Sequence, residues 1–394
     1  MSANAQHRTG GEPIPQFREH VNDMPALEAF LNHAVSFGAS DIILQSGHRP
    51  SMKVGGLLRA FAPYKLQTDQ VERIASIVVG GSSLQATIAA GRAYDAAFQV
   101  SDKHAQNEYG VARRLRFRLN ATGITGRDKG ALQIVLRHIP ADPPTLDQIG
   151  FPEELKSEIG LEQGAFFIAG ETGSGKTTTF AACLRYILEG NTAITGNIVT
   201  YEAPIEYIFT DVVSDTCIIA QSEIPTHLKD FEEGLVNAMR RKPSLIVVGE
   251  MRDPQTIMAG NNAAITGHPV YATVHANNSA VILRRMVSLC DVSQQAQVFS
   301  DLAMNSRLLM SQTLMPKIGG GLICLRDWIV IDPDRGEELL TAGISGHASL
   351  MRRWMEEGER AHSMKASVSD ALNAGLLTEE TAARTLKRYG YRAE

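Results

Sequence analysis

The chain has 394 residues, a formal net charge of −5 and 44% hydrophobic residues. This length predicts two or three domains, and the composition is that of an ordinary folded protein. No apolar run approaches the roughly 18–20 residues that span a membrane, and without a strongly basic balance no direct nucleic-acid binding is expected. The four cysteines have no C-x-x-C spacing, so the sequence indicates neither a zinc site nor a disulfide framework.

The first third of the chain predicts a small α+β domain over residues 23–140. Residues 1–22 are polar, contain no apolar signal core and are expected to form a flexible lead-in. Helical and alternating apolar patterns then follow one another at short intervals. The predicted elements are a helix over 27–35, a strand over 40–44, a hairpin around 53–57, a helix over 69–88, and strands over 116–120 and 132–137.

Pro140, Pro143 and Pro144 interrupt regular structure, and a linker is predicted over residues 141–154. From 155 to 335 strands and helices alternate, which is typical of a mainly parallel sheet covered on both faces. Residues 336–394 are predicted to form a polar helical region. The expected strands of the middle part are 165–169, 197–201, 245–248 and 270–274, and the expected helices are 176–188 and 231–240.

Residues 170–177 match the pattern G-x-x-x-x-G-K-[ST] of a phosphate-binding loop, between an apolar strand and a helix. Its glycines let successive backbone N–H groups point at phosphate oxygens, and the helix adds its own N-terminal donors. Lys176 is expected to reach the β- and γ-phosphates and Thr177 to ligate Mg²⁺. The residues predicted to bind ATP or GTP are Gly170, Glu171, Thr172, Gly173, Ser174, Gly175, Lys176, Thr177 and Thr178.

Three carboxylates follow predicted strands at the edge where parallel-sheet sites form. Glu250 ends the apolar strand 245–248 and is expected to orient the attacking water or to hold Mg²⁺ through water. Glu202 and Glu206 flank Pro204 and form a candidate second acidic shell around Mg²⁺ and water. A solvated strand end and a charged loop are the structural alternatives, and the sequence leaves open which carboxylate is the catalytic base.

His268 and His275 bracket the strand 270–274, and both are expected on the active-site side of the sheet. His275 is the candidate sensor of the γ-phosphate. The alternative for either histidine is a structural role.

Together these segments resemble the secretion ATPase superfamily, the traffic ATPases of type IV pili, type II secretion and type IV secretion. The resemblance covers about residues 25–330 and includes, in the family's order, a Walker A loop (170–177), an "Asp box" (200–206), a Walker B segment (245–253) and a "His box" (266–275). Residues 39–50 also look like the family's N-terminal domain. The resemblance implies a RecA-like P-loop ATPase core, an N-terminal PAS-like α+β domain and a helical C-terminal region.

The same resemblance implies an Mg²⁺-dependent ATPase that forms a homohexameric ring in the cytoplasm. Its expected partners are the inner-membrane complex and coupling components of a secretion apparatus, with peripheral membrane association. Length and boxes are similar to those of pilus retraction ATPases, but Ala203, Ser222 and Lys242 depart from common family residues, and residues 332–340 lack the retraction signature. Residues 267–277 look more like the ATPases of Dot/Icm (type IVB) secretion and IncI-type conjugation.

The favoured function is therefore ATP hydrolysis coupled to assembly or protein/DNA transfer by a type IVB secretion or conjugation system. A pilus retraction motor, a nucleic-acid translocase and a nucleotide-bound hub with little hydrolysis are the alternatives. Arginines near the end of the first domain are candidates for completing the active site, because a guanidinium stabilises charge on the transferred phosphate. The candidates are Arg116, Arg118, Arg127 and Arg137, and the second and fourth are spaced like the family's strand arginines.

Overall fold

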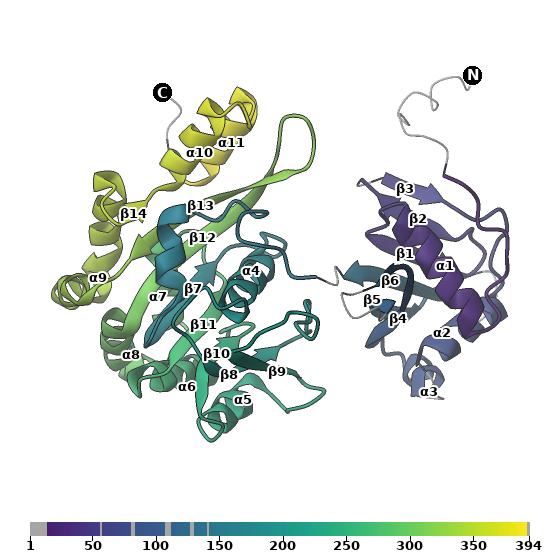
Figure 1. Cartoon of the computed structure of the whole chain (residues 1–394), viewed down its shortest axis with the longest axis horizontal. Helices are drawn as coiled ribbons and strands as arrows, with labels where there is room; N and C mark the ends of the chain where they lie inside the picture. The colour runs from purple at the N-terminus through teal and green to yellow at the C-terminus, as the bar shows by residue number, and fades with distance from the viewer. Residues whose placement is uncertain are drawn as a thin grey trace. The chain divides into compact units, whose positions relative to one another are not determined.

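The structure is a computed structural model that describes residues 14–55, 57–79, 83–106, 112–126, 130–139 and 142–391. The chain divides into two compact units, with the boundary between Ala141 and Asp142 (Figure 1). The predicted candidate Arg127 lies outside the described residues.

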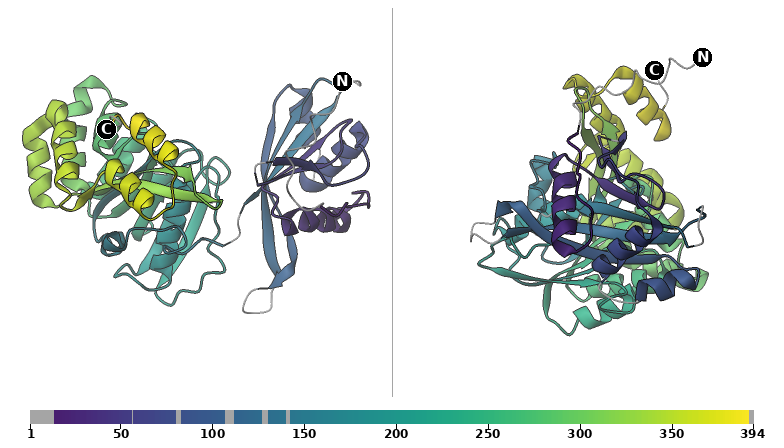
Figure 2. Two further views of the ribbon diagram at one scale, coloured as in Figure 1. Left: turned by 90° about the horizontal axis from the view of Figure 1, so that it is seen from above. Right: turned by 90° about the vertical axis from the view of Figure 1, so that its right-hand side faces the viewer.

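The first unit is a six-stranded antiparallel sheet in the order β3-β2-β1-β6-β5-β4. Its helices lie on one face of the sheet (Figure 2). The core between the helices and the sheet includes Phe30, Phe61 and Phe117. The strands are β1 (Asp41–Gln45), β2 (Ser51–Val54), β3 (Leu57–Ala60), β4 (Tyr94–Gln106), β5 (Ala112–Gly123) and β6 (Leu132–Ile139), and the helices are α1 (Met24–Ser36), α2 (Thr68–Val79) and α3 (Ser83–Ala89).

Two sequence-based expectations for this unit differ from the structure. The single helix predicted over 69–88 is wrong, because α2 and α3 are separate helices. The intervening sequence, Gly80-Gly81-Ser82, has poor helix propensity, which the apolar periodicity outweighed in the prediction. Strand β4 was missed, although Tyr94, Ala96, Phe98 and Val100 alternate with less apolar residues. The predicted lead-in is also not flexible throughout. The Phe17 N–H donates to the Phe61 carbonyl at 2.8 Å, which attaches this part of it to the first unit.

The second unit is an α/β fold built on an eight-stranded mixed sheet, β14-β13-β12-β7-β11-β10-β8-β9. The run from β12 to β9 is parallel, and β13 and β14 are antiparallel. All six residues of β7 are buried, as expected of a strand covered on both faces. The strands are β7 (Gly164–Ala169), β8 (Gly196–Glu202), β9 (Cys217–Glu223), β10 (Pro243–Val248), β11 (Pro269–Val274), β12 (Ser306–Pro316), β13 (Leu322–Val330) and β14 (Ala361–His362).

Helices cover both faces of this sheet and form two separate cores. One face carries η1 (Glu153–Ile159) and α4 (Lys176–Leu188), and the other carries most of the remaining helices. Helices α9, α10 and α11 gather at the β13–β14 end (Figure 1), and α9 is kinked at Gly343. The remaining helices are α5 (Phe231–Ala238), α6 (Pro254–Ile265), η2 (Ser279–Val281), α7 (Ile282–Val287), α8 (Val292–Asn305), α9 (Pro333–Glu357), α10 (Met364–Asn373) and α11 (Glu379–Arg388).

Candidate active site

The predicted phosphate loop joins the end of β7 to the first turn of α4. Gly170, Gly173 and Gly175 all have positive φ angles, of 146°, 80° and 86°, a backbone region that favours glycine. A Cβ atom on Gly170 would lie 2.6 Å from the carbonyl oxygen of Gln312, so close approach of β12 also requires glycine there. The loop therefore has the strand–loop–helix context that lets backbone N–H groups bind an anion.

Lys176 begins α4, and its ammonium group lies over the loop. Nζ donates to the carbonyl oxygens of Gly170 at 2.8 Å and Glu171 at 2.9 Å. Burial lowers the pKa of Lys176, while the negative charges of Glu250, Glu206 and Glu171 act to raise it. The cation thus lies in the field of three acids, two of which are candidate catalytic residues.

Parallel pairing brings the predicted acid and histidine of neighbouring strands to one edge. Val248 is in register with Tyr201 and Ala272, so the residues that follow β8, β10 and β11 lie together. Glu250 Oε1 lies 3.2 Å from His275 Nε2, and both side chains are partly exposed. A carboxylate and an imidazole are therefore held in contact beside a phosphate-type loop, at the edge where parallel sheets bind ligands.

Glu202 is fixed by two neighbouring side chains. Its Oε1 accepts hydrogen bonds from Thr200 Oγ1 at 2.6 Å and from Gln221 Nε2 at 3.1 Å. Gln221 also donates to the Tyr207 carbonyl at 2.8 Å, which joins β9 to the segment that follows Glu202. Together with Thr177, Glu202 lines a small cavity of about 30 Å³. The sequence-based prediction missed Gln221, because β9 itself was not predicted.

The expectation that His268 lies on the active-site side is wrong. His268 precedes β11 and His275 follows it, so the two residues are at opposite edges of the sheet. A six-residue strand is about 20 Å long, too far for both to reach one ligand. His268 Nδ1 instead lies 3.4 Å from Thr266 Oγ1, at the end of α6.

A second cavity of about 560 Å³ borders the loop on the side of β12 and β13. Its lining includes Gly175 and Thr178 from the loop and α4, Leu314 from β12, and Arg326 from β13. Arg326 is 4% exposed and donates to the carbonyl oxygens of Gly150 at 2.7 Å and Ile149 at 3.1 Å. These bonds fix the segment before η1 as one wall of the cavity.

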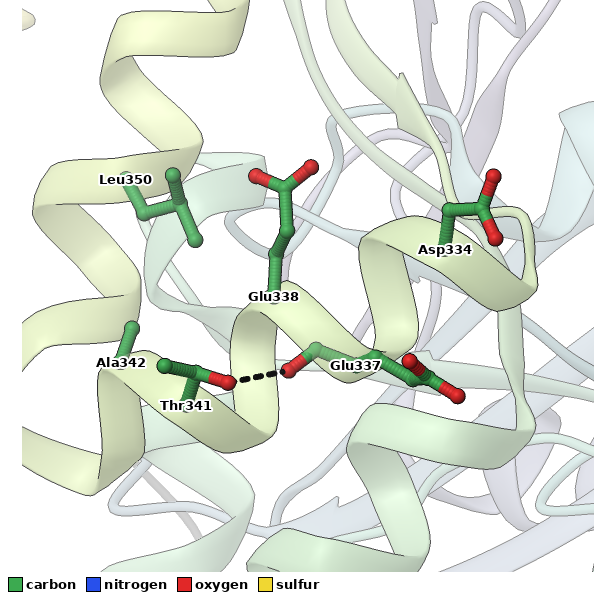
Figure 3. Close-up of a pocket in the computed structure, with 6 residues that line it drawn as sticks. All are labelled: Asp334, Glu337, Glu338, Thr341, Ala342 and Leu350. Carbon is green, nitrogen blue, oxygen red and sulfur yellow. Dashed lines mark hydrogen bonds between the residues drawn. The ribbon is translucent and has the colours of Figure 1, made fainter.

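An acidic depression on α9 has a similar volume, about 580 Å³, but a different chemistry (Figure 3). Three carboxylates line it without a cation among the lining residues, so it is unsuited to a polyphosphate. The hydrogen bond drawn there, from Thr341 Oγ1 to the Glu337 carbonyl at 3.0 Å, is internal to the helix. The lining residues are Asp334, Glu337, Glu338, Thr341, Ala342 and Leu350.

The chain's own groups are consistent with a metal that is bound together with a nucleotide. Within the described residues, no group of three or more His, Cys, Asp or Glu side chains is arranged to hold a metal ion. Mg²⁺ bound to a nucleotide keeps several waters and takes further ligands from the phosphates, so it needs few protein ligands, and Thr177 and Glu250 are the candidates. None of the helices in the described ranges is long and apolar enough to cross a membrane.

In the first unit, the candidate arginines lie on β5 and β6. Arg118 and Arg137 are directly opposite each other in the antiparallel pair, so their side chains share a face. Arg116, two residues before Arg118, belongs to the same face and is 8% exposed. Arg137 Nε lies 2.9 Å from Asp41 Oδ1, and Arg118 is exposed. This face therefore concentrates positive charge.

Comparisons with known proteins agree with this architecture. Residues 105–326 match the family model described as "Type II/IV secretion system protein". The pilus retraction ATPase PilT of Pseudomonas aeruginosa is 33% identical over 296 residues, which cover 75% of this chain and 80% of that protein. The solved structure of the ATPase DotB from Yersinia pseudotuberculosis has a TM-score of 0.84 and 33% identity, and the match covers 95% of this chain and 98% of that one.

A structure of the pilus retraction motor PilT with bound ADP has a TM-score of 0.75 and 27% identity, covering 91% of this chain and 96% of that one. The likeness to PilT and DotB spans both units and nearly the whole length of each structure. This chain belongs to the type II/IV secretion system protein family, among its PilT-like secretion ATPases.

Proposed function

We propose that this protein hydrolyses ATP to ADP and phosphate in an Mg²⁺-dependent reaction. The proposal rests on two observations. Lys176 lies over the phosphate loop, and Glu250 contacts His275 at 3.2 Å at the edge of the sheet where the loop begins. ADP bound to the related motor PilT supports nucleotide binding by this chain.

Each residue then has a distinct task. The backbone N–H groups of the loop and Lys176 would hold the phosphates, and Thr177 would be a protein ligand of Mg²⁺, which would supply positive charge beside the phosphates when bound. Glu250 orients the attacking water, and His275 responds to the γ-phosphate through its contact with Glu250. Glu202, held by Thr200 and Gln221, and Glu206 form the second acidic shell.

The adenine base and ribose occupy the cavity between α4 and the β12–β13 hairpin. This cavity of about 560 Å³ is lined by Gly175 and Thr178, where the loop joins α4. Arg326 keeps its far wall in place through the carbonyls of Ile149 and Gly150.

The second unit acts as the RecA-like ATPase domain (155–335) with a helical C-terminal region (336–394), and the first as the PAS-like domain (23–140). We further propose a cytoplasmic homohexamer, in which arginines of a PAS-like domain approach a nucleotide in cis or in trans. Arg118 and Arg137 are the strongest candidates, because their shared positive face suits an anion.

The complete assembly serves a type IVB secretion or conjugation system, at the inner-membrane face of the apparatus. The extensive likeness to DotB supports this reading. Pilus retraction is the second candidate, and the 33% identity to PilT favours it. Residues 332–340 lack the retraction signature, and Ala203, Ser222 and Lys242 depart from common family residues, so retraction stays the second candidate.

ATP turnover, measured with and without Mg²⁺ and with and without DNA, tests the activity. We expect Mg²⁺-dependent turnover that DNA does not change. Stimulation by DNA would instead indicate a translocase, and nucleotide binding without turnover would indicate a structural hub.

Sedimentation with nucleotide should show a hexamer. A monomer at every nucleotide concentration would contradict the ring.

A further inference from the structure

Gln312 is a buried polar residue beside the phosphate loop that belongs to none of the sequence boxes. It lies on β12, which pairs in parallel with β7, and its neighbour Ser311 is in register with Ala169, the last residue of β7. Gln312 is therefore level with Gly170, where the loop begins. Its side chain is 1% exposed, so its amide must find partners within the protein.

Both ends of the Gln312 amide are occupied, and both partners belong to the loop or to α4. Nε2 donates to the carbonyl oxygen of Ser174 at 2.8 Å. Oε1 accepts from Thr179 Oγ1, in the first turn of α4, at 2.9 Å. A Cβ atom on Gly175 would lie 3.2 Å from Nε2, so the loop packs directly on this amide.

The bond to Ser174 sets the direction of the next N–H group in the loop. In a planar trans peptide the C=O and N–H bonds point in opposite directions. Because the Ser174 carbonyl points at Gln312 on the β12 side, the Gly175 N–H must point away from β12, into the concave side of the loop. That side is where a phosphate group accepts from backbone donors.

We propose that Gln312 is a positioning residue for phosphate binding, acting through the Ser174 carbonyl on the Gly175 N–H. The inference rests on the proposed nucleotide site. Gln312 does not touch the phosphate, so its loss changes the geometry of the loop and leaves the charges of the site unaltered. A purely structural role, in which Gln312 only joins β12 to α4, would act through Thr179 instead.

The test compares two variants that each break one part of this bridge. Gln312→Met keeps the length of the side chain and removes both hydrogen bonds. Thr179→Val keeps its shape, removes the α4 bond, and leaves the bond to Ser174 possible. The measurements are the dissociation constants of ADP and of inorganic pyrophosphate, which probes the loop alone, together with the thermal midpoint of each nucleotide-free protein.

Gln312→Met is expected to weaken both ADP and pyrophosphate binding by about 10-fold or more, the scale of one lost buried hydrogen bond. Thr179→Val is expected to bind both within about twofold of wild type, even where its thermal midpoint falls. Wild-type affinity in folded Gln312→Met would overturn the proposal. An equal loss of affinity in both variants would also overturn it, because the bond to α4 would then be the important one.

If Gln312→Met does not fold, Gln312→Asn replaces it, because its amide is one methylene too short to reach Ser174. The same loss of affinity is expected, and wild-type affinity again overturns the proposal. The proposed nucleotide site is tested separately: if wild type and Lys176→Ala bind ADP equally poorly, that site is wrong. If wild type binds ADP and Gln312→Met binds it as well, only the role of Gln312 is wrong.

Discussion

The phosphate loop lies between two sides of different chemistry. On the reacting side, at the ends of β8, β10 and β11, are Glu202, Glu250 and His275, groups that exchange or attract protons and metal ions. On the supporting side, β12 contributes the neutral amide of Gln312, and the end of α11 contributes Arg388, which pairs with Glu171.

The supporting side is built from the last part of the domain. A cavity of about 350 Å³ lies between the loop and Arg388, Tyr389 and Gly390. Burial and the nearby charge of Asp327 raise the pKa of Tyr389 to about 12, so this phenol stays protonated at any physiological pH. Charged side chains are thus the groups proposed to react, whereas mostly uncharged contacts hold the loop in shape.

Lys176 contacts the carbonyl oxygens of the loop and also lies in the field of Glu250 on the reacting side. Its loss should therefore have the largest effect. Lys176→Ala removes the cation over the loop, so ATP binding should weaken below detection and turnover should fall by at least ~10³-fold. Nucleotide titration measures the first and phosphate release the second. Lys229→Ala, which removes an exposed lysine, is the matched control. Near-wild-type affinity of Lys176→Ala would mean that the loop is not the nucleotide site.

The arginines of the first unit extend the reacting side if a ring forms. At least one alanine substitution among Arg116, Arg118, Arg127 and Arg137 should lower turnover by ~10³-fold, with folding and assembly intact. Isolated surface charges contribute little, so for the exposed Arg118 and Arg137 a structural role predicts almost no change.

Mixing assigns the arginine to its own subunit or to a neighbour. An inactive arginine variant is combined with inactive Lys176→Ala. If the arginine acts in trans, some interfaces of the mixed ring contain both groups and activity returns. Normal turnover in all four alanine variants would confine the reacting side to the second unit.

Glu250→Gln separates chemistry from binding on the reacting side. The amide keeps the size of the side chain and removes the charge that orients water, so turnover should fall by about 10²-fold while ATP affinity is retained. Glu232→Gln, on the exposed face of α5, controls for the loss of a carboxylate. Turnover within a few-fold of wild type would move the role of the base to Glu202 or Glu206.

Arg388→Ala should have the smallest effect of the series. The ion pair with Glu171 is partly exposed, with side chains 44% and 67% accessible, and such pairs contribute ~1 kcal/mol or less. We expect at most a ~5-fold rise in KM and an unchanged kcat. A double-mutant cycle with Glu171→Ala measures the coupling. A large fall in kcat would place α11 on the reacting side.

Sequence patterns predicted the reacting side far better than the supporting side. The loop, Glu250 and His275 lie next to strands with strong apolar signatures, and parallel pairing then places strand ends together by geometry alone. His268 was misplaced because its closeness to His275 along the chain was taken for closeness in space. The two residues lie at opposite ends of β11.

The supporting side depends on pairings between distant segments. Gln312 contacts Ser174 across 138 positions of the chain, and a glutamine within an apolar strand has no local signature. Arg388 lies on a polar helix whose partner cannot be read from periodicity. Likewise, neither β9 nor the antiparallel β12–β13 hairpin was predicted, so Gln221 was missed as a partner of Glu202.

The opposed arginines of β5 and β6 should make the stability of the first unit depend on salt. Arg118 and Arg137 face each other across one strand pair, and only the second contacts Asp41 at 2.9 Å. Like charges in that arrangement repel until an anion arrives between or beside them. Dissolved ions screen exposed charges over about 8 Å at physiological ionic strength. Rising salt should therefore stabilise the isolated first unit and, at the same concentrations, weaken its attraction for any polyphosphate.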